Sequence, residues 1–173
     1  MPSSGRRGAR PSVAALVQAM RDAMAQNDAD ATLQALRQLK HRADDSEAFA
    51  QACIPALGDF ATILGSGQPP TVNMAILVLF KMAATAVGPG ADFDAVGDYR
   101  DPRRDAMRQA GIITLVVPML VPPQTATAEQ LEIVGSLAAL VTALADNVTN
   151  KDAIRQAGAI PHLVALLSAT APA

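Results

Sequence analysis

The 173-residue chain has few of the residues on which catalysis and extracellular stability usually depend. Its one cysteine, Cys53, excludes a disulfide within the chain, and we expect an intracellular location, cytoplasmic or nuclear. The two histidines, His41 and His162, belong to no Cys/His cluster with metal-ligand spacing. No glycine-rich phosphate loop follows a strand pattern, and no nucleophile is paired with a base. We therefore predict no catalytic, cofactor-binding or metal-binding residues, and a protein that is not an enzyme.

Aromatic residues and excess charge are also scarce. Trp is absent and Tyr99 is the one tyrosine, whereas 50% of the chain is apolar, mostly Ala, Leu, Val and Met. Because Ala, Leu and Met are strong helix formers, this composition predicts an all-α protein with closely spaced helices. The net charge of −2 gives no general attraction to nucleic acid or to anionic membranes. The longest apolar runs, around 75–80 and 111–121, are too short for a predicted membrane span.

The beginning of the chain is basic. Arg6, Arg7 and Arg10 precede the first acidic residue, Asp22, and no apolar segment typical of a secretory signal follows them. We expect residues 1–11 to form a disordered basic tail. A targeting or anion-binding role is the alternative.

Apolar residues recur at helical spacing along almost all of the remaining chain. Residues 71–86 are apolar on nearly every side, which predicts a helix that is covered on more than one face in the middle of the fold. The other predicted helices cover 12–26, 29–42, a short stretch ending near 53, 54–64, 131–145 and 160–167. Gly and Asp dominate residues 88–102, which predicts a loop. No segment shows the alternation of a convincing strand.

One nine-residue stretch occurs twice, 47 positions apart. Residues 103–111 read RRDAMRQAG and residues 150–158 read NKDAIRQAG, with six identities. Each copy predicts a short helix with one inward apolar side chain, Met107 or Ile154, and a final glycine that reverses the chain in the left-handed conformation. A weaker copy, SEAFAQACIPAL, places Cys53 at the glycine position, where we expect a small buried residue rather than a nucleophile. A helical repeat of about 40–47 residues indicates an α-solenoid.

The stretch NKDAIRQAGAIPHLVALL (150–167) resembles the armadillo repeat, whose first two helices meet at a G-A-I-P-x-L-V-x-L-L junction. ALRQLK (35–40), VLFKMA (78–83) and LVTALA (140–145) resemble the core of the family's third helix. The resemblance implies a right-handed α-solenoid of about three to four three-helix repeats over 12–168, incomplete at both ends. The units it implies are 12–43, 45–87, 103–146 and 149–168, with a loop insertion at 88–102 and a C-terminal tail at 169–173.

Armadillo solenoids bind peptides or protein surfaces along a concave face that the third helices line. The resemblance thus implies a non-enzymatic protein-interaction scaffold. The family's ligand-clamping Asn corresponds to Gln38, Lys81 and Ala143, and its Trp one turn earlier corresponds to Gln34, Leu77 and Ala139. These replacements count against recognition of basic peptides, because Ala offers no hydrogen bond and Lys repels a basic ligand. The candidate groove residues are Gln34, Gln38, Met74, Leu77, Lys81, Ser136, Ala139 and Ala143, although any of them could instead pack against a neighbouring helix.

The loop at 88–102 contains two further candidate contacts, the rare aromatic residues Phe93 and Tyr99. Its spacing of Asp92, Asp94, Gly97 and Asp98 partly matches a calcium loop. Val96 and Arg103 stand where that motif requires ligands, so a flexible acidic loop is the prediction.

Two helix features have structural consequences. Pro118 predicts a kink or an early stop in the helix that follows the first nonamer. The last apolar helix has no third helix to cover it, so the chain could associate with itself there. The alternative to a binding scaffold is a fragment of a longer solenoid, or a module that assembles end to end, with no ligand of its own.

Overall fold

The computed structural model describes residues 10–43, 47–66, 68–84, 92–93, 99–120 and 128–170. Most of the predicted basic tail, residues 88–91 and 94–98 of the predicted acidic loop and the last three residues of the predicted C-terminal tail lie outside these ranges. The described elements are α1 (Val13–Ala25), α2 (Ala29–Arg42), α3 (Glu47–Cys53), the 3₁₀ helix η2 (Ile54–Ala56), α4 (Leu57–Gly65), α5 (Pro69–Ala84), β1 (Asp92–Phe93), β2 (Tyr99–Arg100), α6 (Pro102–Gln109), α7 (Ile112–Val116), the 3₁₀ helix η3 (Val117–Met119), α8 (Ala128–Ala145), α9 (Val148–Gln156) and α10 (Ala159–Thr170).

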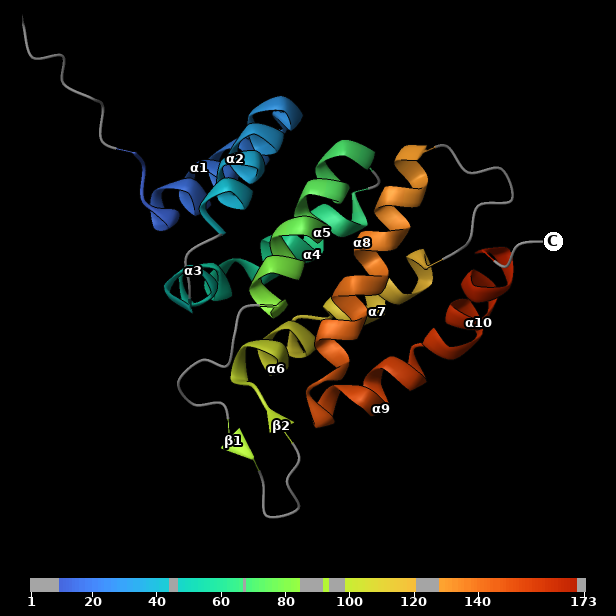
Figure 1. Cartoon of the computed structure of the whole chain (residues 1–173). Coiled ribbons are helices and arrows are strands. Elements are labelled where there is room, and N and C mark those ends of the chain that lie inside the picture. The colour runs from blue at the N-terminus through green and yellow to red at the C-terminus, as the bar shows by residue number, and fades with distance from the viewer. Residues whose placement is uncertain are drawn as a thin grey trace, which may run out of the picture.

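The helices stack in layers, and the predicted all-α architecture is confirmed. Helices α2, α5 and α8 lie side by side along one face, with α5 packed against both of the others (Figure 1). Behind this row, α4 packs against α5 and α7, and α7 contacts α9. Each helix therefore buries its apolar stripe against helices from neighbouring parts of the chain, as in an α-solenoid.

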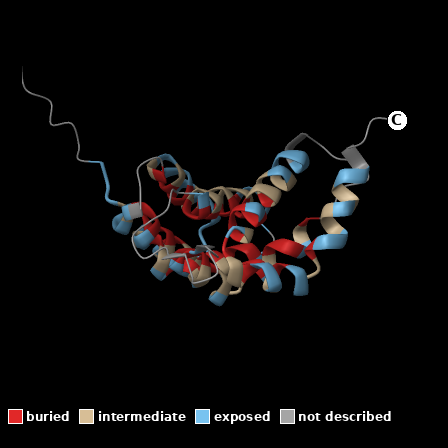
Figure 2. Ribbon diagram, turned by 60° about the horizontal axis from the view of Figure 1, so that its bottom comes forward, coloured by how far each residue is buried: buried red, intermediate tan, exposed pale blue. Residues whose placement is uncertain are grey.

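A continuous apolar core runs through the stack from Leu16 to Ala159. Buried residues lie between the layers of helices, and exposed residues lie on their outer sides (Figure 2). Helix α5 contributes Thr71, Val72, Ala75, Ile76, Val78, Leu79, Met82 and Ala83 to the buried set. These positions cover most of the circumference of the helix, so the predicted central position of this segment is confirmed.

The two nonamers form the corners that their glycines predict. Gly111 has φ 77° and Gly158 has φ 85°, both in the left-handed region that costs a glycine little. Met107 and Ile154, the apolar residues at matching positions, are both buried. The third copy behaves differently, because Cys53 has φ −90° and the chain passes from α3 directly into η2 and α4. A residue with a Cβ atom adopts the left-handed backbone conformation only at a cost in free energy, and Cys53 does not adopt it.

Several boundaries differ from the predictions. Helix α5 begins at Pro69, two residues before the predicted start at residue 71. The N–H groups of a first helical turn have no partner within the helix, so proline fits there. Residues 92–93 and 99–100 form a two-residue antiparallel ladder within the predicted loop, too short to show alternation. Helix α7 stops at Val116 and continues only as the 3₁₀ turn that contains Pro118, as predicted.

One segment, from Ala48 to Gly65, is long and apolar enough to cross a membrane by length and composition alone, with a mean hydropathy of 1.3. It comprises three separate elements, α3, η2 and α4, with Pro55 between the two α-helices. Of this segment 44% is buried, and Cys53, Ala56 and Phe60 within it are fully buried in the core. Core helices commonly have such a composition, so the segment is weak evidence for a membrane span.

Candidate functional site

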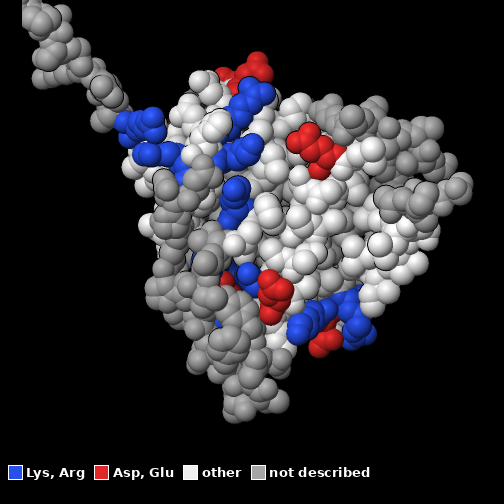
Figure 3. Space-filling model, viewed as in Figure 1, with Lys and Arg blue, Asp and Glu red and all other residues white. Residues whose placement is uncertain are grey.

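The predicted groove residues are brought together on one row of helices. Gln34 and Gln38 lie on α2, Met74, Leu77 and Lys81 on α5, and Ser136, Ala139 and Ala143 on α8. Within each helix the spacing of three, four or seven residues places them on a common face. Since α5 packs between α2 and α8, the three sets are neighbours across the face seen in Figure 3.

The accessibility of these side chains changes along the row. The two glutamines are exposed, Met74, Leu77, Lys81, Ser136 and Ala139 are half-buried, and Ala143 is only 8% exposed. Ala143 therefore offers little surface to a ligand, because it packs between helices. The face accordingly has polar side chains on α2, long apolar side chains on α5 and small side chains on α8.

The hydrogen-bonding groups on this face are unequally available. Within the described residues, the side-chain amides of Gln34 and Gln38 make no hydrogen bond, so each has a free donor and a free acceptor. Ser136 donates its hydroxyl to the carbonyl oxygen of Glu132 in its own helix, at 2.9 Å. The hydroxyl oxygen of Ser136 can therefore accept a hydrogen bond from a ligand, but its hydrogen is already used.

A cavity of about 420 Å³ opens at the α2 end of this face. It is lined by Arg10, Pro11, Leu16, Gln38, His41 and Arg42. One wall is held in place by Arg42, whose Nη2 donates to the carbonyl oxygen of Pro11 at 2.8 Å. Gln38 belongs both to the lining of this cavity and to the row of candidate residues.

The two loop candidates lie elsewhere. Phe93 and Tyr99 pair across the β1–β2 ladder, which lies near α6 and α9 at the edge of the molecule (Figure 1). Their side chains are outside the described part of the structure. The structure does not bring these residues next to the row of candidates on α2, α5 and α8.

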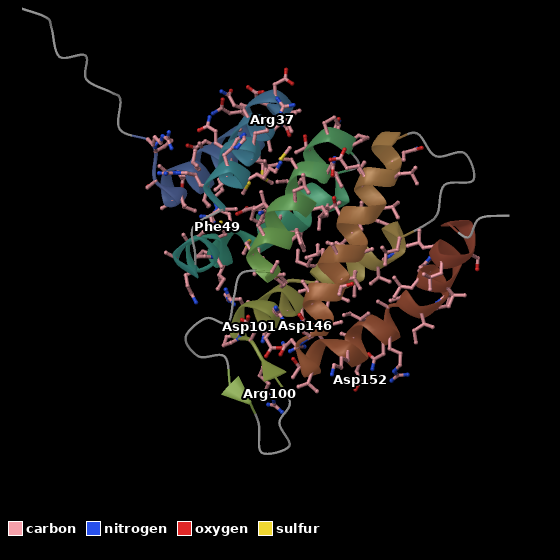
Figure 4. All side chains as sticks on the ribbon, in the orientation of Figure 1. Arg37, Phe49, Arg100, Asp101, Asp146 and Asp152 are labelled. Carbon is pink, nitrogen blue, oxygen red and sulfur yellow. The ribbon has the colours of Figure 1, made fainter. Side chains whose placement is uncertain are left out.

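A buried polar junction, which the sequence analysis missed, joins α6 to α8 and α9. Asp101, only 1% exposed, accepts hydrogen bonds from Arg103 at its backbone N (2.9 Å), Nε (3.0 Å) and Nη2 (2.7 Å). Arg104 reaches toward the carboxylates of both Asp101 and Asp146, which lie close together in Figure 4. Burial raises the pKa of the Asp101 carboxyl. Hydrogen bonds from Arg103 and the positive charges of Arg103 and Arg104 lower this pKa by a larger amount, so it lies below its usual value.

Two asparagines complete this junction across 46 positions of sequence. The Oδ1 atom of Asn147 accepts a hydrogen bond from the backbone N of Asp101 at 3.1 Å. Asn150 donates to the carbonyl oxygens of Arg104 and Leu144, at 3.2 and 3.1 Å. Every one of these contacts joins helix ends, so the junction has a structural role. The aspartate before Pro102 is a recognisable helix start, but its partners could not be found by spacing along the chain.

The last two helices of the stack, α9 and α10, match a known repeat family. The family model for the armadillo/β-catenin-like repeat matches residues 147–173. This C-terminal segment is similar to an armadillo repeat. The match covers α9, the Gly158 corner and α10, where the resemblance to the armadillo junction was strongest. A comparison with curated proteins finds no significant match. The armadillo resemblance assigns α2, α5 and α8 to the third position of their repeats, although the division into units remains a prediction.

No group with evident reactivity accompanies this fold among the described residues. Burial raises the pKa of the Cys53 thiol to about 12, so the thiol stays protonated at neutral pH. Within the described ranges, no cluster of three or more His, Cys, Asp or Glu side chains could hold a metal ion.

Proposed function

We propose that this chain is a non-enzymatic protein-interaction scaffold that binds a peptide or protein segment along the face of α2, α5 and α8. The observation that carries the proposal is the composition of that face: unbonded amides on α2, half-buried apolar side chains on α5 and small side chains on α8. Armadillo repeats typically act as protein-binding scaffolds, which agrees with this face. An intracellular location, cytoplasmic or nuclear, is a further proposal that rests on the single cysteine.

The dimensions of the face suit a short extended segment. Packed helices lie about 8–10 Å apart, so the distance from α2 to α8 is roughly 16–20 Å. An extended chain rises about 3.3 Å per residue, which corresponds to roughly five or six residues of ligand. The amides of Gln34 and Gln38 would bond the ligand backbone, Met74 and Leu77 would contact its apolar side chains, and the small residues of α8 would allow its backbone to approach closely.

The test compares two matched pairs of substitutions in the full chain. Gln34→Ala with Gln38→Ala removes the unbonded amides of the face, and Gln109→Ala with Gln156→Ala removes two exposed glutamines from the nonamer helices. Affinity capture from the native source, followed by crosslinking mass spectrometry, should show a partner that crosslinks to α2, α5 or α8 and is weakened only by the first pair. If the variant with Gln34→Ala and Gln38→Ala captures the same partners as the natural chain, in unchanged amounts, the proposal is refuted.

A second candidate function rests on the outer surface of α10. Ile160, Val164 and Leu167 are 57%, 56% and 73% exposed and follow one another at intervals of four and three residues. They form one apolar stripe on a helix with no Asp, Glu, Lys or Arg. We infer that this stripe supports self-association or end-to-end assembly with similar repeats, in which case the chain is a structural module without a ligand of its own.

A further inference from the structure

Two turns of the chain meet at one end of the helical stack and enclose a second cavity. The α1–α2 turn and the α4–α5 turn both lie at this end (Figure 1). The cavity has a volume of about 330 Å³, which is at the lower end of the range of roughly 300–1,000 Å³ for small-molecule sites. None of the predicted groove residues on α2, α5 and α8 lines it. It is therefore a site distinct from the proposed binding face.

Thr71 gives the clearest indication of a ligand in this cavity. Its side chain lines the cavity at the first turn of α5, and the residue is only 6% exposed. Within the described part of the structure its hydroxyl makes no hydrogen bond. A hydroxyl can donate one hydrogen bond and accept two, and the large majority of buried polar side chains have a partner. A group that enters the cavity would supply the partner that the chain does not.

Three other hydroxyl groups on the walls have already used their hydrogens. Each donates to a nearby backbone carbonyl oxygen: Thr32 to Asp28 at 2.7 Å, Thr62 to Gly58 at 3.1 Å, and Ser66 to Ile63 at 2.7 Å. These three oxygens can therefore only accept hydrogen bonds from a ligand. Such a lining favours a ligand with several hydrogen-bond donors.

The charge of the lining favours a cation. Asp28 is the one charged residue among the described residues that line the cavity. Along the two turns that form the walls, the one position outside the described ranges is residue 67, a glycine, which has no side chain to add a charge. The walls thus combine a carboxylate with hydroxyl oxygens that act as acceptors.

The helix ends around the cavity do not favour an anion. Helices α2 and α5 begin here and α1 and α4 end here, so their dipoles oppose one another. Helix α5 begins with Pro69 and Pro70, which have no N–H group to offer an anion. The start of α2 is capped by Asp28, whose Oδ1 accepts a hydrogen bond from the backbone N of Ala31 at 2.9 Å. An anion would meet the charge of this carboxylate.

We propose that this cavity binds a primary alkylammonium group. The ammonium donates hydrogen bonds to the Asp28 carboxylate and the Thr71 hydroxyl, and the carbon chain packs against Met24 and Ile63, the large apolar side chains of the lining. An ammonium fits better than a guanidinium, because a guanidinium binds best to a carboxylate with both oxygens free, and Oδ1 of Asp28 is already engaged. A free amine and a lysine side chain of another protein both carry this group.

A pair of small probes tests the charge preference directly. Titrations of the ¹⁵N-labelled full chain by NMR would compare n-butylammonium chloride with 1-butanol, which has the same carbon chain and no charge. Butylammonium should shift the amide signals of residues around the cavity with a dissociation constant below about 5 mM, and butanol should bind at least about fivefold more weakly. The affinity for butylammonium should fall as salt is added, because Asp28 is exposed. Equal binding of the two probes, or no saturable shift, would overturn the inference.

Matched charge variants locate the ammonium. Asp28→Asn removes the charge and keeps a good helix cap, and it should weaken butylammonium by about fivefold or more. Asp30→Asn removes the same charge from the first turn of α2, outside the cavity, and should change the affinity less than about twofold. Equal losses in the two variants would show that the probe responds to the general charge of α2, which would overturn the site.

The hydroxyl of Thr71 is tested separately. Thr71→Val keeps the shape of the side chain and should weaken butylammonium by about threefold or more. It should not lower the melting temperature, because the hydroxyl has no partner in the free chain. Thr142→Val, which removes a hydroxyl that donates to the carbonyl oxygen of Ala138 on α8, should leave the affinity unchanged. Unchanged affinity of Thr71→Val, or a lower melting temperature of this variant, would contradict a ligand-binding role.

Two further probes identify the source of the group. Nα-acetyl-lysine N-methylamide carries the ammonium as a protein does, and its norleucine counterpart lacks it. Equal or tighter binding of the lysine derivative than of butylammonium would assign the cavity to a lysine side chain, and weaker binding would assign it to a free amine. Both outcomes support the proposed chemistry, provided that the norleucine derivative does not bind as well. Tighter binding of inorganic phosphate than of butylammonium would overturn the inference in favour of an anion. Since the groove residues do not line this cavity, none of these results depends on the proposed function.

Discussion

The substitution Asp101→Asn tests how much the buried polar junction stabilises the fold. The Asp101 carboxylate is almost fully buried and accepts hydrogen bonds from Nε and Nη2 of Arg103, while Arg104 Nε lies 3.8 Å away. Asparagine has the same size and keeps one oxygen, but it carries no charge and places an amide NH₂ group where the second carboxylate oxygen was. The Arg103 guanidinium, whose side chain is 3% exposed, would remain buried without the charge of Asp101.

The expected cost follows from the chemistry of buried pairs. Breaking such a pair by removing one partner costs about 3–5 kcal/mol, and we expect about 3 kcal/mol for Asp101→Asn because its remaining oxygen keeps part of the hydrogen bonding. Asp101→Ala should cost about 1 kcal/mol more, because the N-cap bond to the backbone N of Arg103 is also lost. Combining Asp101→Asn with Arg103→Met should cost clearly less than the sum of the two single changes, because both members of this ion pair are then removed together.

The pH dependence gives a second, independent measure. The pKa of Asp101 is lowered in the folded state, so its ionised form contributes stability that is fully present above the unfolded value of about 3.9 and is lost as pH falls through the folded pKa. The asparagine at this position does not titrate. The difference in unfolding free energy between the natural chain and Asp101→Asn should therefore be largest near pH 7 and should shrink below about pH 4.

The assay is urea denaturation followed by far-UV circular dichroism at about pH 7 and about pH 3. A loss smaller than about 0.5 kcal/mol at neutral pH would show that the junction contributes no more than an ordinary surface contact. A loss of equal size at both pH values would show that it does not arise from the charge of Asp101.

Three further predictions concern the corner, the cysteine and the last helix. Gly158→Ala should lower the free energy of unfolding by about 1–2 kcal/mol, because the backbone at this position has φ 85°, even though the space around it is open. Gly58→Ala, within α4, should be neutral or stabilising, and thermal denaturation of the two variants measures the difference. Cys53 should react with a thiol reagent at neutral pH only after urea unfolds the chain, because burial raises its pKa to about 12; rapid reaction of the folded chain would contradict this. Val164→Glu with Leu167→Glu should shift sedimenting oligomers to monomers. A natural chain that sediments as a monomer across concentrations would exclude assembly through α10.

Local patterns in the sequence predicted most of the secondary structure. Spacing of apolar residues predicted the helices because a helix exposes the same face every 3.6 residues, whatever the rest of the chain does. The two nonamers predicted their corners for a similar reason, since the left-handed conformation of Gly111 and Gly158 depends on the residue type and its immediate neighbours. The weaker copy shows the limit of the corner pattern: Cys53 is buried as predicted, but without glycine at this position the backbone keeps φ −90° and the chain follows a different path.

The candidate site was predictable only in part. Helical spacing placed Gln34 and Gln38 on one face of α2, but it did not show that Ala143 would be nearly covered. It also gave no indication that Arg104 would lie within 4 Å of the carboxylates of both Asp101 and Asp146. The pairing of a charge depends on which acids the fold brings within about 4 Å, and sequence separation carries almost no information about that distance.

The sequence by itself determined that this chain forms helices, where its corners lie and which family it resembles, because these properties depend on contacts between residues near one another along the chain. The tertiary structure alone decided that Asp101 would meet Asn147 across 46 positions, and that Arg104 would lie within 4 Å of the carboxylates of both Asp101 and Asp146. The physical reason is that burial and ionic pairing are properties of packed helices, and they appear only when the layers of the stack come together.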